Sequence, residues 1–170
     1  ALDAEAYTLE ILENEIRIEA SQPAGAFYAF ESLHQILLIA QNEKKGWPLL
    51  TIEDAPRFQN RGFMSDVARN FYPKEKLFQI LDYMALYKLN RFDLKLTDDD
   101  GWRIEIPGLP ELTEIGAKRG YTLNEKDRLI PMYGSGSGNE NSSGNGFLTG
   151  QDFIEIIQYA KQRNIEVIPQ

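Results

Sequence analysis

Residues 61–103 contain three blocks that set the architecture of this chain: RGFMSDVARNF at 61–71, LFQILDYMALYKL at 77–89 and RFDLKLTDDDGWR at 91–103. The first and third blocks predict β-strands. The second has apolar residues at helical spacing, namely Leu77, Ile80, Leu81, Met84 and Tyr87. Strand, helix, strand is the crossover unit of a parallel sheet. Polar residues crowd the end of each strand, where such sheets bind ligands, so a site is expected there.

The composition indicates a globular protein and excludes several partners. Of 170 residues, 42% are hydrophobic and 26% are charged, which is typical of a folded domain. The formal net charge is -8 and no block of Lys or Arg is present, so nucleic acid is not expected as a partner. No apolar run reaches the length of a membrane span, so no membrane partner is expected either.

Cysteine and histidine usage limits the chemistry within these residues. There is no cysteine, which excludes disulfides, thiolate catalysis and cysteine-bound metals. The only histidine is His34, so neither a two-histidine metal site nor a Ser-His-Asp triad can form within the chain. We therefore expect no metal and no cofactor, and interpret His34 as a residue at the edge of a helix's apolar stripe.

The first third of the chain predicts a small α+β segment. Alternating apolar residues over 7–20 predict a hairpin, and residues 49–52 predict another short strand. Between them, a helix is predicted over 24–41 from an apolar stripe made of Ala26, Phe30, Leu33, Leu37 and Ala40. Asp54-Ala55-Pro56-Arg57 then breaks the pattern. We place a domain boundary there, with residues 1–55 as the C-terminal part of a small domain and 56–170 as a second domain.

The second domain reads as β/α repeats. Strands are predicted at 61–66, 91–97 and 165–168, with helices at 74–88 and 149–163 and a short helix near 109–116. Residues 134–146 are rich in Gly, Ser and Asn, which predicts a flexible segment rather than a phosphate-binding loop. Three strands do not close an eight-stranded barrel, so this part is either a small open sheet or a portion of a larger fold.

The candidate site consists of charged side chains at the ends of the first two parallel strands. Asp66 and Arg69 follow the first strand, and Asp98, Asp99 and Asp100 follow the second. Carboxylates and a guanidinium can hold the paired hydroxyls of a polyol by charge-assisted hydrogen bonds. A solvated acidic turn and a structural ion pair remain open as alternatives. Likewise, Trp102 could stack on a sugar or fill the core of a loop.

Several short motifs in order resemble one enzyme family. They are PRF at 56–58, RG at 61–62, DVARNF at 66–71, MA at 84–85, KLN at 88–90, LTDD at 96–99, GWRIE at 101–105, PELT at 110–113 and IG at 115–116. Together they resemble the β-N-acetylhexosaminidases of glycoside hydrolase family 20. The preceding segment is similar to the end of that family's small N-terminal domain, so the resemblance covers nearly the whole chain.

The resemblance implies an α/β fold: a small α/β N-terminal domain segment followed by the first β/α units of a TIM-type (β/α)8 barrel. It implies release of terminal β-linked N-acetylglucosamine or N-acetylgalactosamine from a glycan or chito-oligosaccharide, with the substrate's acetamido group as nucleophile. By position, Arg69 matches the arginine that binds the outer hydroxyls of the terminal sugar. Asp98 matches the aspartate that supports a histidine on a later loop. A secreted, periplasmic or lysosomal location is implied as well.

The departures from the family pattern raise further expectations. The family's catalytic Asp-Glu pair follows strand four, so we interpret the chain as a fragment truncated after about strand three, with no catalytic residue of its own and no activity alone. Asp93 and Lys95 stand where the family usually has histidines, and Gln170 where it usually has Glu. These changes keep open a non-catalytic sugar-binding or scaffold protein. A truncated barrel would also expose a strand edge, through which the chain could self-associate.

Overall fold

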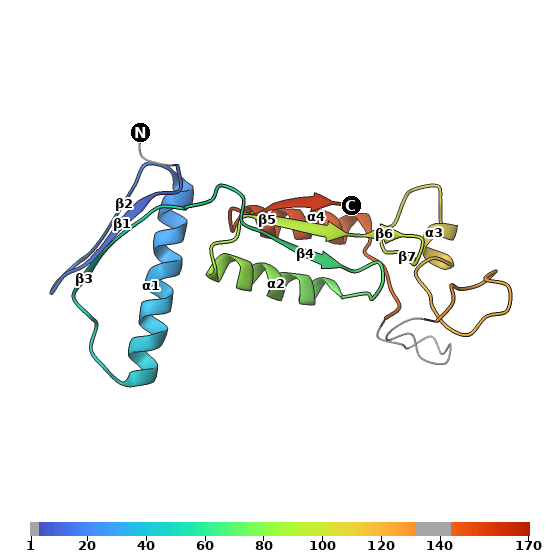
Figure 1. The fold of residues 1–170 in the computed structure, drawn as a ribbon, viewed down its shortest axis with the longest axis horizontal. Coiled ribbons are helices and arrows are strands. Elements are labelled where there is room, and N and C mark those ends of the chain that lie inside the picture. The colour runs from blue at the N-terminus through green and yellow to red at the C-terminus, as the bar shows by residue number, and fades with distance from the viewer. Residues whose placement is uncertain (1–3, 132–143) are drawn as a thin grey trace. The chain divides into compact units, whose positions relative to one another are not determined.

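The computed structural model describes residues 4–131 and 144–170, and these form two compact units. The first unit contains the residues up to Arg61 together with Tyr83–Asn90, and the second contains Gly62–Asp82 and the residues from Arg91 onward. Each unit has its own sheet, shown in Figure 1. The grouping of Tyr83–Asn90 with the first unit was not expected from the sequence. The boundary between residues 55 and 56 stays a prediction.

The first unit is a three-stranded antiparallel sheet with one long helix. Strands β1 (Tyr7–Ile11) and β2 (Ile16–Ala20) form the predicted hairpin, and β3 (Leu50–Asp54) pairs with β1 on the other side. Helix α1 runs over Pro23–Glu43, begins with a proline in its first turn and lies along the sheet in Figure 1. The predicted hairpin, helix and third strand are therefore confirmed.

The core of the first unit lies between β1 and α1. Alternate residues of β1, namely Tyr7, Leu9 and Ile11, are buried, and they pack with Tyr28 and Ala29 of α1. This is the pattern of a strand with one face toward the core.

One detail of the helical stripe predicted for α1 is wrong. Phe30 is 59% exposed, because the buried face of the helix is centred on Tyr28 and Ala29 instead. His34 is exposed too.

The second unit is built on a parallel sheet. Strands β4 (Gly62–Asp66), β5 (Arg91–Lys95) and β8 (Glu166–Pro169) pair in the order β4-β5-β8. Helix α2 (Lys74–Leu86) connects β4 to β5, and α4 (Gly150–Lys161) leads into β8 (Figure 1). The long connection between β5 and α4 holds the small hairpin β6 (Thr97–Asp98) and β7 (Gly101–Trp102) and the short helix α3 (Glu111–Glu114). This hairpin was not predicted.

Helix α4 begins where the sequence predicts. The side chain of Thr149 accepts a hydrogen bond from the backbone N–H of Asp152, whose carboxylate accepts one from the backbone N–H of Thr149. This reciprocal cap satisfies two N–H groups that the first turn would otherwise leave free. Lys74 of α2 donates to Asp152 and Glu155, at 2.6 and 2.7 Å, and so ties the two helices together.

The apolar stripes of the second unit are only partly as predicted. Leu77 and Leu81 of α2 and Ile156 of α4 are fully buried. Tyr87, which follows the last residue of α2, Leu86, is 73% exposed, so the buried stripe does not extend to it.

Two further predictions concern the flexible segment and membrane spans. Of the predicted flexible segment, residues 134–143 lie outside the described residues. Among the helices that are described, none combines the length and the hydropathy needed to cross a bilayer.

Candidate functional site

The register of the parallel sheet brings the predicted site residues to one edge. Asp66 at the end of β4 lies opposite Lys95 at the end of β5, so their side chains share a face of the sheet. The backbone N–H groups of Val67 and Ala68 both donate to the Lys95 carbonyl oxygen, at 3.0 and 3.3 Å. The loop that carries Arg69 therefore starts beside the end of β5, where the acidic run begins.

Arg69 is the centre of the site. Its Nη1 lies 2.5 Å from Oδ2 of Asp66, its Nη2 2.9 Å from Oδ2 of Asp98, and its Nε 3.2 Å from Oδ2 of Asp100. The backbone N–H of Arg69 also donates to Asp66. The predicted proximity of Arg69 and Asp98 at the strand ends is thus found, and two further carboxylates join them.

The three carboxylates fix both the charge and the orientation of Arg69. Hydrogen bonding to Asp66, aided by the charges of Asp66 and Asp98, raises the pKa of the Arg69 guanidinium above its ordinary value. A guanidinium is planar, and contacts on three of its nitrogens leave its plane little freedom to turn. The Arg69 side chain is nonetheless 43% exposed, so a ligand can reach it.

Asp98 joins Arg69 to a second cation. Its Oδ2 lies 2.6 Å from Nζ of Lys95, and the Asp98 side chain is only 11% exposed. Hydrogen bonding to Asp99 and to Lys95 holds the pKa of Asp98 well below its usual range, whereas the hydrogen bond to Asp98 raises the pKa of Asp99. Asp98 is therefore a paired anion, which differs from the solvated acidic turn that the sequence left open. Asp99 is exposed.

The unpredicted hairpin explains how the carboxylates reach Arg69. Asp98 of β6 pairs with Gly101 of β7, and Asp99 and Asp100 form the turn between them. A Cβ atom at Gly101 would lie only 2.3 Å from the Ala68 carbonyl oxygen. Only glycine therefore allows the hairpin to approach the loop that carries Arg69 so closely.

A buried arginine, Arg103, donates a hydrogen bond to the loop that carries Arg69. Arg103 is fully buried, and its Nε donates to the Ala68 carbonyl oxygen at 3.1 Å, while its Nη1 donates to the carbonyls of Ala117 and Gly146. Burial lowers the pKa of Arg103 to about 10. Sequence reasoning did not identify this role, because an arginine after a strand is usually assigned to the surface.

The contacts of Trp102 bear on the two roles left open for it, stacking on a sugar or filling the core of a loop. Its indole Nε1 donates to the Ile104 carbonyl oxygen at 2.8 Å, so the ring's polar edge is engaged within its own loop. This contact favours a structural role for Trp102.

The acidic run is the one described group of side chains that could hold a metal ion. Asp98, Asp99 and Asp100 could each offer one oxygen, with these atoms within 4.8 Å of one another. Two of the three carboxylates already face Arg69, and Asp98 also faces Lys95. A bound metal ion would have to displace these cations.

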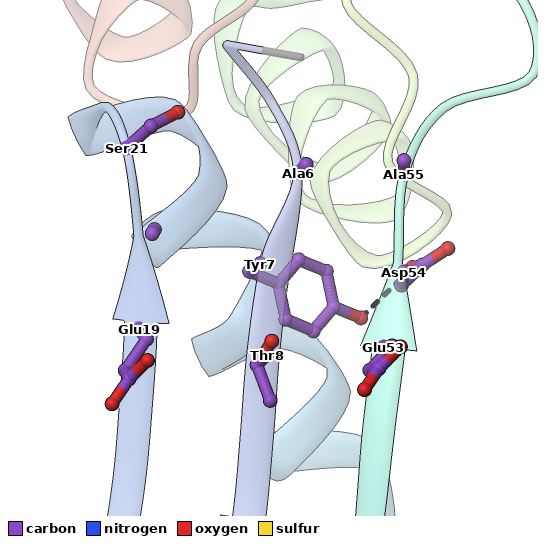
Figure 2. A pocket seen from close by; sticks show the side chains of 9 residues that line it. Ala6, Tyr7, Thr8, Glu19, Ser21, Glu53, Asp54 and Ala55 are labelled. Carbon is purple, nitrogen blue, oxygen red and sulfur yellow. Dashed lines mark hydrogen bonds between the residues drawn. The ribbon is translucent and has the colours of Figure 1, made fainter. Parts of the chain in front are cut away.

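The first unit holds a pocket of its own, about 480 Å³ in volume, at one end of its sheet (Figure 2). Glu19, Glu53 and Asp54 line it, and Tyr7 points its hydroxyl to Asp54, donating to Oδ2 at 2.9 Å. Lys88 also donates to that oxygen, at 2.8 Å. Asp54 is therefore satisfied within the unit, and none of the residues lining this pocket is a predicted site residue.

The parallel strands and the polar group at their carboxyl ends define an α/β protein of the kind that binds ligands at strand ends. Comparison with known families gives the particular one. Residues 58–170 match the catalytic domain of glycosyl hydrolase family 20, and residues 1–55 match domain 2 of the same family. The chain belongs to glycosyl hydrolase family 20.

Named relatives agree with this assignment. The chain is 50% identical over 165 residues to the N,N'-diacetylchitobiase of Vibrio harveyi, a match that covers 97% of the chain and 18% of the relative. It is 44% identical over 163 residues to a β-hexosaminidase of Vibrio vulnificus, covering 96% of the chain and 19% of the relative. The chain thus spans about a fifth of the length of these relatives.

Solved structures show the same fold. The GH20 exo-β-N-acetylglucosaminidase of Vibrio harveyi, in complex with N-acetylglucosamine, aligns with a TM-score of 0.80 at 39% identity, over 99% of this chain and 25% of that one. The β-N-acetylhexosaminidase of Bacteroides fragilis aligns with a TM-score of 0.78 at 32% identity, over 99% of this chain and 31% of that one.

Proposed function

We propose that this chain supplies the sugar-binding strand ends of a β-N-acetylhexosaminidase, with Arg69 as the residue that holds the outer hydroxyls of the terminal sugar. The observation that carries the proposal is the arrangement around Arg69. Its Nε and Nη1 donate hydrogen bonds to Asp100 and Asp66, and its Nη2 forms an ion pair with Asp98, so N–H groups remain on both Nη1 and Nη2. An N–H on each of these two nitrogens suits a pair of neighbouring hydroxyl oxygens.

The proposed reaction uses the substrate's own acetamido group. Its carbonyl oxygen forms a bond to the anomeric carbon while the glycosidic C–O bond breaks, and a carboxylic acid protonates the leaving oxygen. Water then attacks the anomeric carbon and restores the acetamide. We assign neither the acid nor the group that orients the acetamide to this chain, because the carboxylates of Asp98 and Asp100 are paired with Arg69.

The proposal includes the domain organisation and the larger fold. Residues 1–55 would be the C-terminal part of the small α+β domain, and residues 56–170 the first portion of a (β/α)8 barrel. The parallel order β4-β5-β8 supports this, since sequential strands are neighbours in such a barrel. The active complete enzyme is then a protein that contains this chain and the rest of the barrel.

The ion pair of Lys95 favours an enzyme over a non-catalytic scaffold. The sequence departs from the family pattern at Lys95, yet Lys95 contacts Asp98, which in turn contacts Arg69. The substitution therefore supplies a cation beside the site and leaves the Arg69 contacts in place.

Chromogenic glycosides test the proposed function. We expect the complete enzyme to hydrolyse the β-N-acetylglucosaminide and the β-N-acetylgalactosaminide. It should leave the β-glucoside intact, because the glucoside lacks the acetamido nucleophile. Equal turnover of the glucoside would contradict the substrate-assisted reaction, and no turnover of any of the three would favour the scaffold. The isolated chain should turn over none of them, since it lacks a positioned acid.

A further inference from the structure

Arg119 is a buried arginine that the proposed reaction does not use. It is 1% exposed, and its backbone forms a bridge with Leu129. The N–H of Gly120 donates to the Leu129 carbonyl oxygen, and the N–H of Leu129 donates to that of Lys118. The backbone N–H of Arg119 donates to the side chain of Asn145 at 2.9 Å, and its Nη1 donates to the Ile130 carbonyl oxygen at 3.1 Å. These contacts hold Arg119 in one place.

The rest of the Arg119 guanidinium faces the site. Its Nε and Nη2 have no hydrogen-bond partner among the described residues, although both are buried. Its Nη2 lies 3.7 Å from Oδ1 of Asp100, the one carboxylate within 4.0 Å of it in residues 4–131 and 144–170. Among the described residues, Asp100 is therefore the group that can balance the charge of this buried guanidinium.

Asp100 is thereby held from two sides. Oδ1 faces the buried Arg119, and Oδ2 accepts a hydrogen bond from Nε of Arg69 at 3.2 Å. We propose that Arg119 is a positioning residue: through Asp100 it fixes the plane of the Arg69 guanidinium, and so the direction of the two N–H groups offered to the sugar. The inference rests on the proposed sugar-binding role of Arg69.

The physical reason lies in the position of Asp100. It stands in a two-residue turn and its side chain is 36% exposed, so solvent can compete for it. Without the buried charge behind it, the carboxylate would turn toward water more readily, and Nε of Arg69 would lose a fixed acceptor. Arg69 would still reach the sugar, but the plane of its guanidinium would be less restricted. This change should weaken substrate binding more than it slows the chemical step.

Steady-state kinetics of the complete enzyme test this inference with the chromogenic β-N-acetylglucosaminide. We expect Arg119→Met to raise KM roughly tenfold and to change kcat by less than about twofold. Arg119→Lys, which keeps the charge, should raise KM less than Arg119→Met does. KM of the double variant Arg119→Met with Asp100→Asn should be no higher than the larger KM of the two single variants, because both changes break the same contact between Arg119 and Asp100.

Arg61→Met is the matched control. Arg61 also donates to backbone carbonyls, those of Lys88 and Phe58, and pairs with one carboxylate, Glu5 at 2.6 Å, but it belongs to the first unit. The Arg61→Met substitution should lower the unfolding temperature and leave KM unchanged. If Arg119→Met does not fold, Arg119→Lys and Asp100→Asn carry the test alone, with KM expected to rise in both.

The outcomes separate this inference from the proposed function. If Arg69→Ala raises KM and Arg119→Met behaves like Arg61→Met, the positioning role is wrong and the sugar-binding role of Arg69 stands. Additive effects of Arg119→Met and Asp100→Asn would also overturn it. If Arg69→Ala itself leaves KM unchanged, the proposed function of Arg69 fails, and the positioning role fails with it.

Discussion

At the scale of single residues, the site is an arginine whose orientation is set by three carboxylates. Each carboxylate meets a different nitrogen of Arg69. Such a group offers a fixed pair of N–H donors while its own charge is balanced locally. Under the proposed function, this arrangement lets an acidic chain, with a net charge of -8, present an arginine to a neutral sugar.

Asp98→Asn tests the pairing at that centre. The neutral amide cannot balance both Arg69 and Lys95, which share Oδ2 of Asp98. We expect KM of the complete enzyme for the β-N-acetylglucosaminide to rise roughly tenfold, since Arg69 loses one of the ion pairs that fix its orientation. Asp99→Asn is the isosteric comparison and should change KM little, because Asp99 has no ion pair with Arg69 among the described contacts and an amide at this position can still donate a hydrogen bond to Asp98. Equal effects of the two substitutions would contradict this account.

Sequence reasoning found part of this site. Arg69, Asp66 and the acidic run were recognised because parallel strands end at one edge, and this holds for any β/α unit. Arg103 and Arg119 could not be found in the same way. Their burial depends on how the long connection between β5 and α4 folds back, and no spacing or periodicity encodes that path.

At the scale of secondary-structure elements, the hairpin β6–β7 is what delivers two of the carboxylates. It approaches the loop after β4 so closely that Gly101 leaves no room for a side chain. The sequence predicted one strand over 91–97, and the structure divides the region into β5 and β6. A two-residue strand is too short for alternation to be recognised, which explains why the hairpin was missed.

Gly101→Ala measures the importance of this close approach. The new methyl group would meet the Ala68 carbonyl oxygen, so we expect a loss of about 1–3 kcal/mol in the free energy of unfolding. Gly150→Ala is the control, because no atom lies within 4 Å of the Cβ position there. It should be neutral or slightly stabilising at the start of α4. Denaturant titration of both variants would check this, and a Gly101→Ala protein as stable as the wild type would rule out the tight contact.

The start of α4 gives a prediction that depends on pH. Hydrogen bonds from Lys74 and Thr149 lower the pKa of Asp152 from its ordinary 3.8 to about 2. A depressed pKa means that this contribution to stability is complete above the ordinary value and is lost as pH falls from about 4 to about 2. Asp152→Asn should therefore cost about 1 kcal/mol at pH 7, as the loss of a helix cap does, and almost nothing near pH 2.

Denaturant unfolding at several pH values would measure that difference. A cost for Asp152→Asn that stays constant from pH 7 to pH 2 would mean that the charge of Asp152 does not stabilise α4. Gln158→Asn, at an exposed position of the same helix, should show no dependence on pH.

At the scale of the whole molecule, the chain contains a parallel sheet with two edges. In the order β4-β5-β8, strands β4 and β8 each have one neighbour among the described strands. Phe63 and Met64 of β4 are 45% and 54% exposed, which places apolar surface next to an open edge. Such an edge can pair with another chain.

We therefore expect the isolated chain to self-associate. Light scattering over a range of concentrations should show a mass that rises above that of one chain, 19.4 kDa. Met64→Lys should shift the association to higher concentration, because a charge on an edge strand opposes pairing. A mass of one chain at every concentration would contradict this prediction.

The central claim is that Arg69 binds the sugar, and kcat/KM of an Arg69→Ala variant of the complete enzyme tests it most directly. With the chromogenic β-N-acetylglucosaminide we expect kcat/KM to fall by about a hundredfold, since charge-assisted hydrogen bonds to two hydroxyls are lost. The protein should remain folded, because the Arg69 side chain is 43% exposed. A folded Arg69→Ala enzyme whose kcat/KM equals that of the wild type would contradict the claim.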